Sequence, residues 1–443
     1  MLFRSPLPRL LPALFLLVLL AAMTHDAHAQ PPEEFNEDES KVEAYTLPDL
    51  LVGPDGEEVT TPEGWRTVAR PRWMEILEEQ EYGRRPAPVP VTAEKVERGE
   101  GPGGTRRIQA RLRLGQGPDA PATEVLLYLP PLSLPPDRPG AARFPTFLHL
   151  NFGGNHAETA DPAVRIPAGW VPNGKETGVT ENRALAASRG TLAHRWPIDR
   201  LAARGFATAT AYYGDVFPDR ADGRAESALP SLGYESDRAR LAPDEPGAIS
   251  TWAWQLSRIL DWLVTLPEID PERVIVVGHS RLGKTALWAG AGDERFAMVV
   301  SNESGCGGAA LERRNFGETV RRITTVFPHW FCPNFAGWAG RAPEMPFDQH
   351  VLLAMTAPRP LYVASAAEDL WADPRGEFLA AVAAAPAWEL FGKEGLGTAD
   401  FPAPDAPVGG SIGYHVRSGA HDLLAWDWER FADFAEKALP RGR

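Results

Sequence analysis

The stretch "VIVVGHSRLGKTALWAG", residues 274–290, decides the fold. An apolar run ends at Gly278 and a helical segment starts directly after Ser280, so the serine falls on a tight turn between strand and helix. A serine on such a turn is typical of a nucleophile elbow, whose usual pattern is G-x-S-x-G. Here Leu282 holds the place of the second glycine, and Gly283 follows one residue late. The context predicts that Ser280 is a nucleophile; the alternative is a serine that caps an ordinary helix.

On both sides of this stretch, apolar strands alternate with helical segments. The predicted strands cover residues 106–114, 123–130, 144–154, 206–214, 273–280, 296–304, 360–369 and 412–421, and the predicted helices 67–83, 198–205, 248–266, 281–291 and 423–439. This alternation predicts an α/β fold of the α/β-hydrolase type, with a mostly parallel central sheet flanked by helices. Long inserts at 155–197 and 305–358 are expected to shape the active-site cleft.

The first residues have the composition of a secretory signal peptide. Arg4 and Arg9 come before a short apolar run, 10–23. A cleavage site of the small-x-small type follows and ends at Ala29. The run is shorter than the roughly 20 residues that a membrane span needs, which disfavours the alternative of a membrane anchor. We therefore expect a signal peptide over 1–29, cleavage near Ala29, and a secreted or periplasmic protein that keeps no membrane segment after cleavage.

The remaining chain is expected to form a flexible acidic leader, 30–44, and a single catalytic domain, 45–443. The net charge of −14 argues against nucleic acid as a partner. The two cysteines, Cys306 and Cys332, could be buried thiols or a bridge, and the sequence leaves both possibilities open. It contains neither C-x-x-C nor H-E-x-x-H, so we expect no metal and no cofactor.

A serine nucleophile needs a base, and in α/β hydrolases the histidine comes last in chain order. His421 fits this position among the ten histidines, because it follows the last predicted strand and precedes the last predicted helix. His415 lies on that strand and is expected to be structural. His279 is adjacent to the serine in sequence, and its side chain is expected to project away from the cleft.

The acid that orients the base has candidates in two places. The loop after the strand that precedes the histidine strand offers Glu368, Asp369 and Asp373. Glu303 ends the strand that follows the nucleophile helix, and a carboxylate there could also reach the imidazole. Either carboxylate fits the role of holding the imidazole tautomer, and each could instead be a solvated surface group. The residues alone leave Asp369 and Glu303 open.

Several further motifs, in the right order along nearly the whole predicted mature chain, carry a family resemblance. They are "NFGGNH" (151–156), "RGTLAHRWPIDRL" (189–201), "YYGDVFPD" (212–219), "GHSRLGK" (278–284), "NESGCGG" (302–308), "FGETV" (316–320), "FPHWFCPNF" (327–335), "DLWADPRGEF" (369–378) and "HxxxxWDW" (421–428). Together they resemble the glucuronoyl esterases of carbohydrate esterase family 15, bacterial type. Those enzymes are α/β hydrolases that cleave the ester between a glucuronic acid carboxyl group on xylan and a lignin alcohol.

The resemblance implies roles for the cations around the nucleophile. In this family the serine turn carries the nucleophile, and the arginine that matches Arg281 helps to form the oxyanion hole. A cation next to the serine binds developing negative charge more strongly than a neutral donor, although Arg281 could also be a surface ion pair. Some family members use the acid that matches Glu303 and others the one that matches Asp369, so this sequence, which has both, keeps the two options.

The resemblance also implies a sugar-binding set. Lys284 lies one helical turn from Ser280 and matches a residue that hydrogen-bonds sugar hydroxyls. Glu318 matches a hydroxyl acceptor, and Trp371 matches an aromatic residue that contacts the ring. The alternatives are a solvated lysine and a core tryptophan.

The predicted function is that of a serine carboxylic ester hydrolase of the 4-O-methyl-glucuronoyl methylesterase type. Its expected partner is a lignin–carbohydrate ester of glucuronoxylan. A different enzymatic hypothesis is an esterase for another carbohydrate ester or a small aryl ester, such as an acetyl esterase. A non-enzymatic hypothesis is a carbohydrate-binding protein on an inactive hydrolase fold, and the filled serine, histidine and acid positions count against it.

Overall fold

The structure, a computed structural model, describes residues 35–131, 143–175 and 177–439. Contacts group the described residues from Asn36 onward into one compact unit. The predicted signal peptide lies outside the described residues. None of the helices in the described ranges is both long and apolar enough to cross a membrane.

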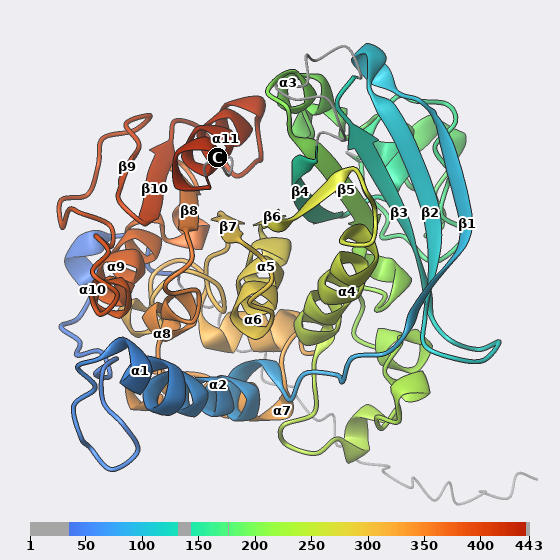
Figure 1. Ribbon diagram of the computed structural model, residues 1–443. Helices are drawn as coiled ribbons and strands as arrows, with labels where there is room; N and C mark the ends of the chain where they lie inside the picture. Colours follow the sequence, from blue (N-terminus) through green and yellow to red (C-terminus); the bar gives the residue numbers. More distant parts are fainter. Residues whose placement is uncertain (1–34, 132–142, 176, 440–443) are drawn as a thin grey trace, which may run out of the picture. The chain divides into compact units, whose positions relative to one another are not determined.

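One ten-stranded sheet runs through the described residues in the order β1-β2-β3-β5-β4-β6-β7-β8-β10-β9 (Figure 1). The strands are β1 Val91–Glu100, β2 Arg106–Leu114, β3 Ala122–Leu129, β4 Phe144–Asn151, β5 Ala207–Tyr212, β6 Ile269–His279, β7 Met298–Asn302, β8 Leu361–Ala366, β9 Val408–Gly409 and β10 Ile412–Arg417. The pairs from β5 through β4, β6, β7 and β8 to β10 are parallel, and the outer pairs are antiparallel. This is the mostly parallel sheet that the sequence predicts.

Helices cover both faces of this sheet. They are α1 Pro62–Gly64, α2 Arg70–Leu77, α3 Ile198–Ala203, α4 Ala248–Leu263, α5 Arg281–Gly292, α6 Val320–Val326, α7 Pro333–Ala336, α8 Gln349–Ala354, α9 Pro374–Ala384, α10 Pro386–Glu389 and α11 Ala425–Ala438. Strand β6 shows why two layers are needed, because its side chains alternate between faces. Val274 and Val276 join the core under α4 and α5, whereas Ile275 and Val277 join the core under α3 and α11 (Figure 1).

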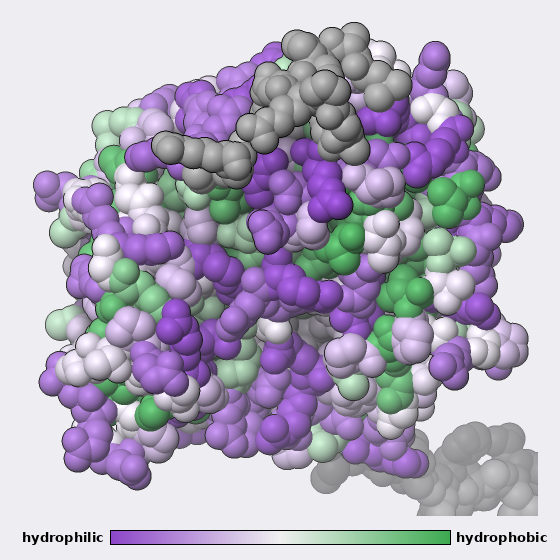
Figure 2. Space-filling model, in the orientation of Figure 1, coloured by the Kyte–Doolittle hydropathy of each residue, from purple (hydrophilic) through white to green (hydrophobic). Residues whose placement is uncertain are grey.

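Two strands were not predicted, and both lie at the edges of the sheet. Strand β1, "VTAEKVERGE", is polar and largely exposed, so it lacks the apolar run that marks the other strands. Strand β9 has only two residues and pairs with β10. Hydrophilic residues also predominate on the face of the molecule that Figure 2 shows.

The predicted acidic leader is described from Asn36 onward, and this part differs from a flexible segment. The carbonyl of Asn36 accepts a hydrogen bond from the Gly317 amide, 2.8 Å away. Glu39 forms an ion pair with the buried Arg314 at 2.6 Å. The acidic residues indicated a solvated leader, but Glu39 pairs with a buried cation. This ion pair and the Asn36 hydrogen bond hold residues 36–41 against the segment before α6.

Candidate active site

Ser280 lies on the sharp turn between β6 and α5, as predicted. Its backbone has φ 57° and ψ −132°, a strained conformation for a residue with a side chain. A Cβ atom at position 278 would lie 1.8 Å from the Leu282 carbonyl oxygen, so only glycine fits there. A Cβ at Gly283 would lie 2.9 Å from that of Ser304, which explains the late glycine, because position 283 is the one that packs against the end of β7.

The turn also presents hydrogen-bond donors. The amides of Gly283 and Lys284 donate to the Ser280 carbonyl, at 2.8 and 3.3 Å. The first N–H groups of a helix have no partner within the helix and point out of its N-terminus. The N-terminus of α5 directly after Ser280 is therefore an environment that favours a negative charge on an atom bound to the serine.

Arg281 is held in a cage of aromatic rings beside the serine. Its guanidinium carbon lies 4.8 Å from the ring centre of Trp330, 5.5 Å from that of Phe327 and 5.8 Å from that of Phe152. One of its nitrogens donates to Asp219, and its side chain remains 29% exposed. Burial lowers the pKa of Arg281, but the Asp219 carboxylate outweighs this effect and raises it, so the cation is permanent.

Asp219 is the residue that fixes this cation. Besides Arg281, it accepts hydrogen bonds from His329 Nε2 at 2.7 Å, from the Trp330 indole at 2.7 Å and from the Tyr213 hydroxyl at 3.0 Å. Burial raises the pKa of Asp219, yet Arg281 and His329 hold it well below its usual range. Asp219 ends the motif "YYGDVFPD", to which the sequence assigns no role. Four donors from three segments make it a buried anion that orients Arg281.

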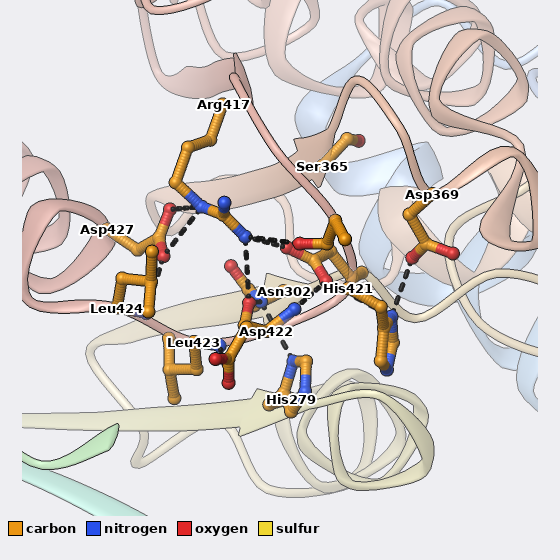
Figure 3. A network of polar contacts seen from close by, with 12 residues as sticks. His279, Asn302, Ser365, Asp369, Arg417, His421, Asp422, Leu423, Leu424 and Asp427 are labelled. Carbon is orange, nitrogen blue, oxygen red and sulfur yellow. Dashed lines mark hydrogen bonds and ion pairs between the residues drawn. The ribbon is translucent and has the colours of Figure 1, made fainter. Parts of the chain in front are cut away.

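His421 lies between the two candidate acids, so the structure brings both to one imidazole. Nδ1 of His421 is 2.6 Å from an Asp369 oxygen and 3.1 Å from a Glu303 oxygen (Figure 3). With Nδ1 engaged as a donor, Nε2 is left as the basic nitrogen. Burial lowers the pKa of His421, but hydrogen bonds and charges of Asp369 and Glu303 outweigh it and raise the pKa to about 9.

The two carboxylates differ in their other partners. Among the described residues, the Asp369 carboxylate forms a side-chain hydrogen bond with the imidazole alone. Glu303 also accepts from Arg417 at 2.9 Å and from the Asp422 amide at 2.8 Å. It sits at φ 49°, immediately after β7, and is 2% exposed. Burial raises the pKa of Glu303, and the His421 and Arg417 contacts oppose that rise.

His279 does not project away from the cleft, contrary to the sequence-based expectation. Its ring centre lies 4.5 Å from that of His421, at an angle of 35° between the ring planes. Its Nδ1 accepts from the Asn302 amide at 2.9 Å, and the same amide donates to the Asp422 carbonyl at 3.1 Å. Burial and the neighbouring His421 hold the pKa of His279 well below its usual value, so His279 is a neutral ring beside the His421 imidazole. His279 is still part of β6 and pairs with Asn302 of β7.

Ligand-type atoms of His279, Glu303 and His421 lie within 4.8 Å of one another. Such a group could hold a divalent metal in principle. However, these ligand atoms already accept hydrogen bonds from the protein. The Asn302 amide donates to Nδ1 of His279, and Arg417 and the Asp422 amide donate to the oxygens of Glu303. The group is better described as a hydrogen-bonded support for the base.

The three predicted sugar-binding residues lie on neighbouring segments. Lys284 is buried, and its ammonium group donates to the Ser304 carbonyl. The Glu318 amide donates to the Trp371 carbonyl at 2.9 Å. Burial raises the pKa of Glu318, while Lys284, Arg281 and a hydrogen bond with the Trp371 side chain lower it. Glu318 and Trp371 are both partly exposed, so neither is a pure core residue.

The remaining candidates have other roles. Glu368 is exposed, and Asp373 pairs with Arg314 at 2.8 Å and caps α9. His415 is buried between the Tyr362 hydroxyl and Asp427, as expected of a structural histidine. Cys306 and Cys332 are both free and buried.

Comparison with known proteins places this geometry in a family. A sequence model described as "Glucuronyl esterase, fungi" matches residues 241–392. The carbohydrate esterase MZ0003 of an unknown prokaryotic organism is 43% identical over 420 residues, which are 94% of this chain and 95% of that protein. The 4-O-methyl-glucuronoyl methylesterase of Podospora anserina is 37% identical over 156 residues, 33% of this chain and 32% of that enzyme.

Two solved structures agree over most of the chain. A promiscuous CE15 esterase from a marine bacterial metagenome has a TM-score of 0.85 at 42% identity and covers 92% of this chain and 100% of its own. The glucuronoyl esterase of Solibacter usitatus has a TM-score of 0.82 at 41% identity and covers 91% and 100%. These similarities confirm the predicted fold and the family resemblance. The chain with Ser280 on its nucleophile turn therefore belongs to carbohydrate esterase family 15, the family of the glucuronoyl esterases, and to its bacterial type.

Proposed function

We propose that this enzyme hydrolyses esters between glucuronic acid, or its 4-O-methyl form, on glucuronoxylan and lignin alcohols, with Ser280 as nucleophile and His421 as base. The observation that carries the proposal is the position of the His421 imidazole, which lies 2.6 Å from Asp369 and has its ring centre 4.5 Å from that of His279, the residue that precedes Ser280. Relatives that bear the name glucuronoyl esterase support the substrate class. The export predicted for residues 1–29 would bring such an enzyme to plant cell-wall polymers.

The proposed reaction proceeds through an acyl-enzyme. Oγ of Ser280 attacks the ester carbonyl carbon while Nε2 of His421 takes its proton. The carbonyl oxygen becomes an oxyanion, which the first amides of α5 and the cation of Arg281 stabilise. Collapse breaks the bond to the alcohol, which leaves with the proton from Nε2. Water then attacks the Ser280 ester by the same proton route and releases the uronic acid.

Asp369 is proposed as the principal orienting acid. It makes the shorter contact with Nδ1, 2.6 Å against 3.1 Å for Glu303. Glu303 also balances the charge of Arg417, so a smaller share of its charge is directed at the imidazole. Glu303 is therefore proposed as a secondary acid that both supports the imidazolium and holds the histidine segment.

Lys284, Glu318 and Trp371 are proposed to recognise the uronate ring. An ammonium group donates three hydrogen bonds, and Lys284 uses one on Ser304, which leaves donors for sugar hydroxyls. Glu318 offers acceptors, and the face of Trp371 offers the apolar surface that a sugar ring packs against. Such contacts favour a hydroxyl-bearing ring over a bare acetyl group.

A second candidate function is hydrolysis of other carbohydrate or aryl esters. The similar metagenomic esterase is described as promiscuous, which favours testing a broader set of substrates. Turnover of benzyl glucuronate, of its 4-O-methyl form and of an acetylated sugar, measured side by side, separates the two candidates. A higher kcat/KM on the acetylated sugar would replace the uronate assignment.

The nucleophile is tested by Ser280→Ala. The variant is expected to remain folded by circular dichroism and to lose several orders of magnitude in turnover, on the order of 10⁶ if it behaves as in a well-studied protease. Mass spectrometry after treatment with a serine-directed covalent inhibitor should find the label on Ser280 in the wild type. Near-normal turnover in the folded variant would end the proposed mechanism.

A further inference from the structure

Arg417 stands out among the described residues because it is buried, charged and in contact with the base segment, yet the proposed reaction does not use it. It is the last residue of β10 and is 4% exposed. Its Nε lies 3.2 Å from both carboxylate oxygens of Asp427, near the start of α11. Figure 3 shows the guanidinium between Asp427 and the segment that carries His421.

The opposite side of the guanidinium binds the histidine segment on both flanks. One nitrogen donates to the carbonyl of Ala420 at 2.9 Å and to that of Asp422 at 3.2 Å, the residues before and after His421. The same nitrogen donates to Glu303 at 2.9 Å. A single side chain thus fixes the backbone on either side of the imidazole, which a loop without secondary structure would otherwise leave free to shift.

The ion pair between Arg417 and Glu303 also affects the charge state of His421. Glu303 is buried and lies 3.1 Å from Nδ1 of His421, so its negative charge favours the imidazolium. Arg417 is the cation paired with Glu303. Without it, Glu303 would act on His421 with its full, unbalanced charge, and the neutral imidazole that serves as base would form only at higher pH.

We propose that Arg417 is a positioning residue for the catalytic histidine, which fixes the segment 420–422 and balances the charge of Glu303 so that Asp369 is the acid that acts most directly on His421. This inference rests on the proposed role of His421 as base. The interaction is indirect, because Arg417 contacts Glu303 and the backbone and not the imidazole.

Other charged and titratable groups around this segment must stay constant in a test. They are His279 at the end of β6, Arg281 on α5, Asp369 after β8, Asp427 on α11, Asp422 in the segment itself, and Arg195 and His194 of the first long insert, which pair with Asp422. None of them is changed in the variants below.

The test compares Arg417→Gln, which removes the charge, with Arg417→Lys, which keeps the charge but cannot span Asp427, Glu303 and two carbonyls. Two readouts are used: the pKa of His421 by NMR of the labelled imidazole, and the pH dependence of kcat/KM on an activated aryl ester. Arg417→Gln should raise the pKa of His421, and shift the acid limb of the profile upward, by about 1 pH unit. Arg417→Lys should keep the limb in place and lower kcat by about tenfold.

A double variant tests the route through Glu303. In Arg417→Gln/Glu303→Gln, Glu303 no longer leaves a buried unpaired charge, and Asp427 keeps His415 and the Leu424 amide as partners, so the fold should hold even if Arg417→Gln alone does not. Its His421 pKa should match that of Glu303→Gln within about 0.3 pH unit, because Arg417 then has no anion to balance. Arg359→Gln is the matched control: Arg359 binds the carbonyls of Gly290 and Phe296 at the opposite end of the sheet, so its loss should change stability and leave the His421 pKa unchanged.

The inference is overturned if Arg417→Gln loses activity while the His421 pKa and the acid limb stay at their wild-type values, because Arg417 would then be only structural. It is also overturned if Arg417→Lys retains the wild-type kcat, or if the double variant differs in His421 pKa from Glu303→Gln. The NMR readout does not depend on turnover or on a sugar substrate. A failure of the proposed function, seen as full activity in Ser280→Ala, is therefore distinguishable from a failure of this inference.

Discussion

The two sides of the candidate active site each contain an ion pair between an arginine and a carboxylate, and the two pairs have opposite orientations. Beside Ser280, Arg281 is partly exposed and Asp219 lies buried behind it. Beside His421, Glu303 lies against the imidazole and Arg417 is buried behind it. One pair therefore presents its cation to the reaction, and the other presents its anion.

This difference matches the charges that an acyl-transfer reaction creates. In the transition state the carbonyl oxygen becomes negative and the imidazole becomes positive. A presented cation stabilises the first charge and a presented carboxylate the second. The partner behind each presented group reduces the cost of burying it. Variants that remove these charges test whether each one has the role that this comparison assigns to it.

Among these charge variants, the largest decrease in kcat is expected when His421 loses both neighbouring acids. The double variant Glu303→Ala/Asp369→Ala should lower kcat by ~10³–10⁴, because the imidazole then has neither a fixed tautomer nor a counterion. Asp369→Ala alone should cost more than Glu303→Ala alone, and each should cost less than the double variant. Steady-state kinetics on one ester measure all three. If one single variant equals His421→Ala and the other has wild-type activity, one acid acts alone.

The pH dependence of kcat/KM tests the action of Asp369 on His421 by the direction in which the acid limb shifts. The two carboxylates raise the pKa of His421 to about 9, so the neutral base, and with it kcat/KM, should increase with pH up to that region. Removing one carboxylate must lower this pKa, so Asp369→Asn should move the acid limb to lower pH by at least about 1 unit. An unmoved limb would show that Asp369 does not act on His421 in solution.

Loss of the presented cation should rank second. Arg281→Ala is expected to lower kcat by roughly 10²–10³, with similar losses on glucuronate esters and on simple activated esters, because the oxyanion is common to both. Asp219→Asn keeps the size of the side chain but removes the negative charge and one of the two accepting oxygens that hold Arg281 in place, and it should cost less than Arg281→Ala. An effect of Arg281→Ala confined to KM would assign this cation to substrate binding and would break the comparison.

The smallest effects are expected at the sugar-binding residues. Lys284→Ala, Glu318→Ala and Trp371→Ala should mainly raise KM for glucuronate esters and spare simple esters, since ring contacts persist in both ground and transition states. Measuring kcat and KM on both substrate types decides this. Because Lys284 binds the Ser304 carbonyl beside Glu303, an equal loss of kcat on both substrates would place it in the catalytic machinery.

The sequence predicts the central strands and the positions of Ser280 and His421 because both follow local rules. Apolar runs mark buried parallel strands, and the nucleophile turn needs glycine at 278 for a steric reason. Strand β1 escaped prediction because its residues are polar, and its pairing with β2 is non-local. The relevance of the inserts at 155–197 and 305–358 was inferred from their length, because no hydrophobic periodicity indicates it.

The supporting residues could not be found from spacing alone. Arg417 lies only four positions before His421 in "HVRSGAH", but its partner Glu303 is 114 residues away. Asp219 and Arg281 are 62 residues apart. For His279, its position next to Ser280 in the sequence suggested the wrong direction, because the ring at the end of β6 lies against that of His421, which is 142 residues later in the chain. Pairings of this kind depend on the closed tertiary structure.

The backbone conformation of Ser280 has a consequence for stability. A side chain at φ 57° and ψ −132° costs on the order of 1–3 kcal/mol, against a total stability of about 5–15 kcal/mol for a typical domain. The nucleophile position is therefore a place where the fold is weaker than it could be, and glycine there would relax the turn. Selection for a more heat-resistant molecule would favour losing the serine, whereas selection for ester cleavage retains it, so thermostability and turnover compete at this one residue.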